Sequence, residues 1–418
     1  CKAGSKTASE CCLPQRLKGR HRAALFFCRN CGENMSMTLT NSDIAELTAF
    51  RRDLHRHPEL SGQERETAQR VVSALSHHSP DTVLTGLGGH GVAAVYQGSA
   101  DGPTVLFRAE LDALPIHELS DAPHASAIAG KGHLCGHDGH TTILMALARL
   151  LSRHRPANGR VVLMFQPAEE TGAGAAVVID DPRFETIAPD YAFSLHNMPG
   201  LPLGHVGLIA GPVNCASRGL RVTFTGKSTH ASEPENGTSP MAALSHLMPA
   251  LTALSHGTTQ DPDFTLVTVT HAQMGAPAFG IAPGEATLFA TLRTLTDDRM
   301  KTLCDTALNM INETAGQNGL SVTHGFEDIF LHCENHPHAT DILRTALDKL
   351  NIRHDASGLP MRASEDFGRF GHSAKSAMLF LGAGVDHAAL HNPDYDFPDD
   401  LIPTGARIFE QVTRDLLG

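Results

Sequence analysis

Apolar residues recur at helical spacing in the early, regular part of the chain. The first such segment begins at Asn41 or Ser42, either of which can cap a helix, and ends at Pro58. A second helical segment runs from about residue 63 to 75, and a more uniformly apolar one covers 141–151. The pattern therefore predicts three helices in this part of the chain.

Short apolar blocks alternate with these helical segments. They are Val92–Tyr96, Thr104–Phe107, Val161–Phe165, Tyr191–Leu195 and Met378–Leu381. Several of them lack polar interruptions, as expected for strands that are covered on both faces. Alternating strands and helices predict an α/β fold with a mixed, mostly parallel sheet between helices.

The pattern changes between residues 215 and 327. Leu220–Phe224, Thr265–Thr270 and Ala286–Leu292 alternate apolar and polar residues, as half-exposed strands do. Amphipathic helices are expected at about 240–255 and 298–317. We therefore expect an inserted α+β domain over 215–327, between two parts of a larger domain at 35–214 and 328–418.

Residues 1–34 differ from everything that follows. The stretch is basic, rich in cysteine and aperiodic, and it begins with Cys rather than Met. Cys28 and Cys31 form a C-x-x-C pair, but no second pair accompanies it, so a zinc site there is not expected. We predict a disordered or appended tail, with Met35 or Met37 as a natural start.

The charge and cysteine content narrow the setting. The 418 residues carry a formal net charge of -12, which argues against nucleic acid and anionic membranes as partners. No apolar run reaches the roughly 18 residues that span a bilayer, and Ala23–Cys28 is too short for a secretory signal. The nine cysteines are an odd number, and those beyond the tail are scattered. A cytoplasmic, reducing location is therefore expected.

Polar side chains follow four of the predicted strands directly. The clusters are Arg108–Asp112, Gln166–Glu170, His196–Asn197 and, after a Gly-rich loop, Leu390–Asn392. Ligands of α/β proteins bind beyond the carboxyl ends of the strands, so these clusters can converge although they are far apart in sequence.

The segment Cys135–His140, with the sequence CGHDGH, precedes the helix at 141–151. Thiolate, imidazole and carboxylate together suit Zn, Co, Ni or Mn better than Ca or Mg. The ordinary alternative is a Gly-rich turn with Asp138 as the helix cap. Glu169 and Glu170 are a second signal, because one carboxylate can bind metal while its neighbour acts as general base. Their ordinary alternative is a pair of solvated loop residues.

At these residues the chain resembles the aminoacylase, hippurate hydrolase and indole-3-acetyl-amino-acid hydrolase branch of the dinuclear metallopeptidases. The resemblance runs from about residue 44 to the C-terminus. The matching stretches are RRDLHRHPELSGQERETA from Arg51, FRAELDALP from Phe107, GHLCGHDGHTTILMALA from Gly132, VVLMFQPAEETGAGA from Val161, FSLHNMPGLPLG from Phe193, FTGKSTHASEPENGTSP from Phe224, SEDFGRF from Ser364 and LHNPDYDFPDDLIPTG from Leu390.

The resemblance implies a role for each matching residue. It implies two divalent metal ions, Mn or Zn with Co or Ni as alternatives, and five ligands: Cys135, His137, Glu170, His196 and His391. Glu169 matches the general base and Asp112 a carboxylate near the metals, although Asp112 could also be a turn residue before Pro115. The resemblance also implies that the inserted domain is a lid over the catalytic domain and that a homodimer can form through it. His230 matches a histidine of this lid that reaches over the substrate of the same chain or of the partner. The ordinary alternative for His230 is a loop histidine without a role in catalysis.

Other positions bear on the substrate. Relatives usually have Asp at the position of Glu110, which is a mild change. They often have Asn at the position of Gly280, and if that Asn helps to bind the substrate, the pocket of this chain differs. Arg293, on a lid strand, could pair with a substrate carboxylate or be an ordinary surface residue, and Asn197 is a further candidate for substrate binding.

The expected activity is metal-dependent hydrolysis of a small-molecule N-acyl-amino acid to a carboxylic acid and an amino acid. Glu169 would move the proton, and His230 would stabilise the oxyanion. The alternatives are a dipeptidase or carboxypeptidase with the same metals, a non-catalytic binding protein, and a cysteine hydrolase with Cys135 as nucleophile.

Overall fold

A computed structural model describes residues 38–418. These residues lie in one compact unit. The predictions for the tail at residues 1–34, including the C-x-x-C pair at Cys28 and Cys31, lie outside the described residues.

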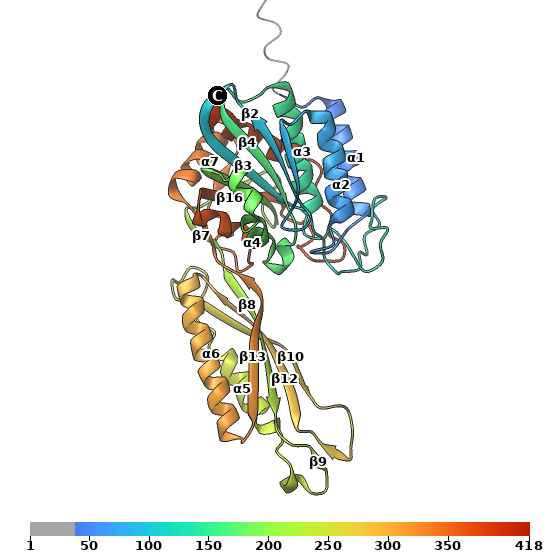
Figure 1. The fold of residues 1–418 in the computed structure, drawn as a ribbon, viewed down its shortest axis with the longest axis vertical. Coiled ribbons are helices and arrows are strands. Elements are labelled where there is room, and N and C mark those ends of the chain that lie inside the picture. The colour runs from blue at the N-terminus through green and yellow to red at the C-terminus, as the bar shows by residue number, and fades with distance from the viewer. Residues whose placement is uncertain (1–37) are drawn as a thin grey trace, which may run out of the picture. The chain divides into compact units, whose positions relative to one another are not determined.

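The larger sheet has eight strands in the order β1-β2-β4-β3-β5-β16-β6-β15. Figure 1 labels four of them, β2, β4, β3 and β16. The bounds of the eight strands are β1 Thr82–Leu87, β2 Gly91–Gln97, β3 Ala100–Glu110, β4 Asn158–Gln166, β5 Tyr191–Pro199, β6 Val206–Gly207, β15 His354–Asp355 and β16 Lys375–Gly384. The central strands β4, β3, β5 and β16 run parallel. At one edge β2 pairs antiparallel with β4, and β1 pairs antiparallel with β2. The predicted mixed, mostly parallel sheet is therefore confirmed.

Helices cover both faces of this sheet, because alternate residues of each strand enter different cores. On β3, Val105 and Phe107 pack in one core and Leu106 packs in the other. The first core is closed by α1 Asn41–Arg56, α2 Arg65–Leu75, α3 His137–Arg153, α7 Pro337–Leu350 and α8 Leu401–Leu417. The second is closed by α4 Gly174–Ile179 and the 3₁₀ segments η3 Pro182–Ile187 and η5 Asp366–His372.

The start of α3 differs from the sequence prediction in a way that matters for the site. The helix begins at His137 rather than near residue 141, after Gly136 with φ 94°. Any larger residue at 136 would clash, because an added Cβ would lie 1.9 Å from Asn197 Oδ1. Asp138 does not cap the helix. Its carboxylate instead accepts hydrogen bonds from His55 Nδ1 at 2.8 Å and Arg51 Nη1 at 3.3 Å, which tie α3 to α1.

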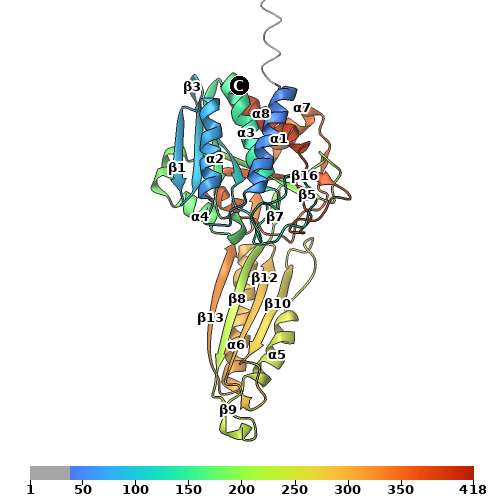
Figure 2. The same cartoon turned by 90° about the vertical axis from the view of Figure 1, so that its right-hand side faces the viewer.

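A second sheet, called the lid sheet here, has four antiparallel strands in the order β10-β12-β8-β13. Its strands are β8 Ala216–Thr225, β10 Thr265–Met274, β12 Glu285–Thr294 and β13 Ser321–Phe330. The helices α5 Met241–Thr252 and α6 Asp297–Gln317 cover one face of it and close a separate core (Figures 1 and 2). The edge strand β13 was not predicted, because most of its residues are exposed and carry no apolar alternation.

Several short elements complete the described part of the chain. β9 Thr229–His230 pairs with β11 Ile281–Ala282, and β7 Gly211–Asn214 pairs with β14 Cys333–Asn335. The 3₁₀ segments η1 Ser76–His78, η2 Glu169–Thr171 and η4 Pro234–Asn236 lie in connections. Within the described part, no helix combines the length and apolarity needed to cross a membrane.

Candidate metal centre

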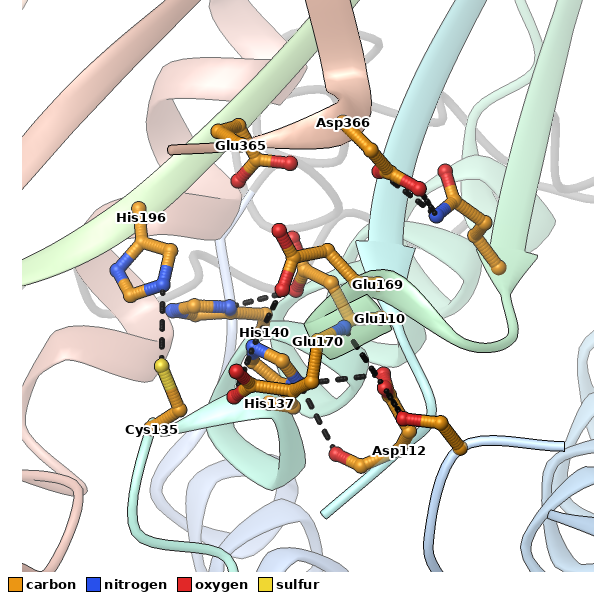
Figure 3. Close-up of polar contacts among 12 residues, drawn as sticks. Glu110, Asp112, Cys135, His137, His140, Glu169, Glu170, His196, Glu365 and Asp366 are labelled. Carbon is orange, nitrogen blue, oxygen red and sulfur yellow. Dashed lines mark hydrogen bonds and ion pairs between the residues drawn. The ribbon is translucent and has the colours of Figure 1, made fainter. Parts of the chain in front are cut away.

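The polar clusters meet at the carboxyl ends of the parallel strands, as the sequence predicts. Glu110 ends β3, the segment η2 with Glu169 and Glu170 follows β4, and His196 lies near the end of β5. Figure 3 shows these side chains around one point, together with Cys135 and His137 from the start of α3. A cavity of about 230 Å³ opens there, and Cys135, Glu169, Glu170, His196 and His391 all line it.

The candidate ligands are close enough to share metal ions. The ligand atoms of Cys135, His137 and His196 lie within 4.8 Å of one another, and so do those of Cys135, Glu170 and His391. Cys135 belongs to both groups, so it could help to hold an ion in either one. The five residues predicted as ligands are thus brought together.

Hydrogen bonds to the backbone fix the orientation of two imidazoles. Nδ1 of His137 donates to the carbonyl oxygen of Asp112 at 2.9 Å, and Nδ1 of His196 donates to that of Asn197 at 2.8 Å. Because a carbonyl only accepts, the proton must be on Nδ1, which leaves Nε2 of each ring as a ligand atom. Such bonds are typical of metal-binding histidines.

Unpaired polar atoms indicate that a cation fits. Nε2 of His137 and Oε1 of Glu170 are buried and have no hydrogen-bond partner among the described residues. Leaving such groups unpaired costs roughly 1–3 kcal/mol each, and more when they are charged. A bound cation would satisfy both atoms.

The charge balance leads to the same conclusion. Burial and the neighbouring Glu365 and Glu170 carboxylates hold the pKa of Glu169 well above its usual value. Burial also raises the pKa of Glu170 to about 7, although His137 opposes the shift. Burial and the carboxylates of Glu170 and Glu169 raise the pKa of the Cys135 thiol. Divalent cations would relieve this repulsion and favour the ionised ligands.

Asp112 supports the ligands from behind. It is fully buried, and its Oδ2 accepts hydrogen bonds from Ser61 Oγ at 2.7 Å and from the backbone N–H of Glu170 at 3.0 Å. Its Oδ1 lies 3.4 Å from Nδ1 of His137. The carboxylate therefore holds the backbone of one candidate ligand and the ring of another, which an isolated turn residue would not do.

His140 and Asn197 form a further layer behind the ligands. His140 Nδ1 donates to Glu110 at 2.7 Å, and its Nε2 lies 2.8 Å from Asn197 Oδ1. Asn197 is 1% exposed and is not among the residues that line the cavity. The structure thus places Asn197 beside His140 rather than at the predicted substrate position.

The lid sheet contributes Arg293 to the cavity wall but not His230. Nη1 of Arg293 donates to Arg362 O at 3.0 Å and to Ser364 Oγ at 2.9 Å, and no described carboxylate pairs with it. His230 is exposed, lies in the short strand β9, and has Nδ1 2.6 Å from Ser232 Oγ. It is not among the residues that line the cavity.

One buried ion cluster was missed by sequence reasoning. Arg108 has no exposed side-chain surface and contacts Glu110, Asp366 and Glu365. Asp366 also accepts hydrogen bonds from Gln166 Nε2 at 2.9 Å and from the backbone N–H of Ala175 at 2.8 Å. The SEDF motif and the strand-end position of Arg108 were visible in the sequence, but nothing there showed that they meet.

The α/β sheet and this donor set define the class of the protein as a metallohydrolase. Residues 106–415 match Peptidase family M20/M25/M40, and the chain belongs to this family. It is therefore an enzyme of a class that hydrolyses amide bonds, as the resemblance implied.

Individual relatives point to a narrower group. The chain is 31% identical to the IAA-amino acid hydrolase ILR1-like 5 of Arabidopsis thaliana, over 89% of this chain and 87% of that protein. It is 30% identical to an N-acetyl-L-cysteine deacetylase of Bacillus subtilis, over 89% and 88% of the two chains. The hippurate hydrolase of Campylobacter jejuni is 31% identical, over 89% of this chain and 97% of that protein.

Solved structures agree with this assignment. A putative aminohydrolase from methicillin resistant Staphylococcus aureus superposes with a TM-score of 0.80 at 26% identity, over 90% of this chain and 97% of that one. A dinuclear metal binding peptidase of the M20 family from Bacillus subtilis superposes with a TM-score of 0.76 at 25% identity, over 90% and 99%.

Proposed function

We propose that this protein hydrolyses the amide bond of small N-acyl-amino acids to a carboxylic acid and an amino acid. The observation that carries the proposal is the set of candidate ligands with Glu169 beside it at one cavity. The names of the relatives support acyl-amino acids as the substrate class, because each name describes a hydrolase or deacetylase that acts on such a compound.

In this proposal Cys135, His137, Glu170, His196 and His391 hold two divalent ions, Mn or Zn, with Co or Ni as alternatives. The mixed thiolate, imidazole and carboxylate donors fit borderline ions of this kind. The bound ions supply two things, a water whose pKa is lowered towards neutrality and a polarised carbonyl group.

Glu169 moves the proton. Its carboxylate is 5% exposed and lines the cavity, so it reaches the reacting atoms while bulk water is excluded. Burial raises its pKa, which makes it a stronger base than an exposed glutamate. It takes a proton from the attacking water and delivers that proton to the leaving nitrogen, so that it returns to its starting state.

Arg293 is assigned to the substrate carboxylate. Its guanidinium faces the cavity without a carboxylate partner among the described residues, and burial lowers its pKa. A half-buried guanidinium that lacks a carboxylate partner gains most from a bidentate carboxylate. The cavity wall also has an apolar part, which is formed by Phe330, Met361, Phe380 and Leu390. They fit an apolar acyl group or amino-acid side chain.

We assign His230 to stabilising the oxyanion that forms during the reaction. Its imidazole N–H reaches the oxyanion when the lid closes over the substrate, which is bound either to the same chain or to the partner in a homodimer. Mixing His230→Ala with Glu169→Gln protein separates the two cases. Activity recovered on mixing supports a donor from the partner, and no recovery in a verified mixed dimer supports the same chain.

The test of the function is a panel of N-acetyl- and N-benzoyl-amino acids together with dipeptides, assayed before and after EDTA treatment. We expect hydrolysis of the acyl-amino acids, loss of activity with EDTA and recovery with Mn²⁺, Co²⁺ or Zn²⁺. Preference for dipeptides would favour a dipeptidase. Full activity in a verified metal-free sample would overturn the mechanism and favour Cys135 as a nucleophile.

We also propose that the protein is located in the cytoplasm. Cys135, Cys215, Cys304 and Cys333, the cysteines of the described residues, are all free. Free thiols fit a reducing compartment such as the cytoplasm. Reactivity of these thiols in freshly lysed cells, measured by a thiol probe, tests this.

A further inference from the structure

Glu365 is a carboxylate of the candidate site that has no role in the hydrolysis proposed above. It precedes η5, is 2% exposed, and lines the same cavity as Cys135 and Glu169. Carboxylate oxygens of Glu365, Glu169 and Asp366 lie within 4.8 Å of one another. Figure 3 shows the carboxylates of Glu365 and Glu169 facing each other.

The two oxygens of Glu365 have different surroundings. Oε1 accepts the backbone N–H of Phe367 at 3.0 Å and lies 3.0 Å from Nη2 of Arg108. Oε2 accepts no hydrogen bond from any described residue. The carboxylate is therefore anchored by one oxygen, and the other remains an acceptor for something in the cavity.

A third metal ion is not the best occupant for this acceptor. The guanidinium of Arg108 already pairs with Glu365 and Asp366 from the buried side. A second cation on the same carboxylates would be repelled by that fixed charge. A neutral hydrogen-bond donor, or a group that becomes positive only during the reaction, suits the position better.

The proposed reaction contains such a group beside Glu169. The scissile nitrogen of an N-acyl-amino acid carries one N–H, and it must turn its lone pair towards Glu169 to be protonated. An acceptor on the other side of the nitrogen would fix that orientation, and it would stabilise the positive charge that develops as the amine leaves. Glu365 stands next to Glu169, where this acceptor is needed.

We propose that Glu365 accepts a hydrogen bond from the N–H of the scissile amide and thereby restricts the enzyme to substrates that carry this N–H. The assignment rests on the proposed amidohydrolase function. It makes Glu365 a residue that positions the leaving nitrogen and selects secondary over tertiary amides.

The test compares N-benzoylglycine with N-benzoyl-N-methylglycine, whose amide nitrogen has no hydrogen, in the metal-loaded enzyme. Wild-type enzyme is expected to prefer the first. In Glu365→Gln the two donors around Oε1 will hold the amide oxygen, so the NH₂ group faces the cavity and meets the substrate N–H. We expect kcat/KM for N-benzoylglycine to fall about 10–100-fold, the range for a lost charged hydrogen bond. The value for the N-methyl substrate should change little, so the preference collapses.

Asp366→Asn is the matched control. Asp366 belongs to the same motif and the same Arg108 cluster, but it does not line the cavity. This variant should melt at a lower temperature, because its buried hydrogen bonds are weakened, and should keep the wild-type preference. Both variants should retain the wild-type metal content.

Three results would overturn the assignment. The first is an equal kcat/KM for both substrates in the wild-type enzyme. The others are an unchanged preference in Glu365→Gln and an equal loss of preference in Asp366→Asn. If the wild type hydrolyses neither these substrates nor any other acyl-amino acid, the proposed function fails as well, and the two failures are thus distinguishable.

Discussion

The metal centre and the strand that carries His230 hold their polar side chains in opposite ways. Around the metal centre, His137 and His196 are each fixed by a hydrogen bond to a backbone carbonyl, and Asp112 is fully buried. His230 is exposed on β9, and its Nδ1 lies 2.6 Å from the hydroxyl oxygen of Ser232, two residues further along the chain. The centre is built before any substrate arrives, whereas the position of His230 is not fixed by a core.

This difference has a thermodynamic meaning. A preorganised site needs little reorganisation during the reaction, but it must bury groups that repel one another, as the raised pKa of Glu169 indicates. In the proposed mechanism the exposed His230 acts only when substrate binding drives closure. We expect substitutions in the first region to remove chemistry or metal, and substitutions in the second to change a step that depends on closure.

The largest effect is expected for Glu169→Gln. It should lower kcat by about 10²–10⁴-fold because the general base is lost, with metal content unchanged. Glu170→Gln is the neighbouring comparison and should instead lower metal occupancy, measured by elemental analysis of dialysed protein. Equal metal loss in both variants would show that the two carboxylates do not divide their roles in this way.

His230→Ala tests the other side of the comparison. A donor used only in the transition state costs roughly 10²–10³-fold in kcat when it is removed, while KM and metal content change little. Steady-state kinetics on the best acyl-amino acid measure the split. If KM rises and kcat stays near normal, His230 binds substrate, and the oxyanion depends on the metal centre alone.

Arg293 lies between the two regions in character, since it comes from the lid sheet and lines the cavity. Arg293→Met should raise KM about 10–100-fold for an acyl-amino acid, because a charged hydrogen-bond pair is lost. The corresponding acyl-amino-acid amide, which has no carboxylate, is the control substrate and should be affected much less. An equal effect on both substrates would assign Arg293 to the cavity wall through its bonds to Arg362 and Ser364.

The smallest effects concern packing, measured by thermal or urea unfolding. Gly139 in α3 has no room for a side chain, because an added Cβ would lie 2.3 Å from the buried Phe397 ring. Gly139→Ala should destabilise the protein by about 1–3 kcal/mol. Gly316 in α6 has no atom within 4 Å of such a Cβ, so Gly316→Ala should stabilise by up to about 1 kcal/mol. Equal responses would contradict the difference in packing between these helices.

The regular elements could be predicted where the local pattern was strong. The strands β2 to β5 and the helices α1, α2 and α6 were recognised from period and capping to within a few residues. The edge strand β13 and the helices α7 and α8 were not. For β13 the reason is its exposure, since a strand with little buried surface has little apolar pattern to show.

The sequence by itself determined the chemical inventory of this protein, because the donor types in CGHDGH, the Glu169–Glu170 pair and the motif order depend only on residue identity. Only the tertiary structure decided which atoms face one another. It directed Asn197 to His140 rather than to the cavity, and it placed Glu365 opposite Glu169 although 196 positions separate them in the chain. The physical reason is that burial, hydrogen-bond direction and charge proximity are properties of packed neighbours. No local pattern along the chain encodes which neighbour a folded sheet will supply.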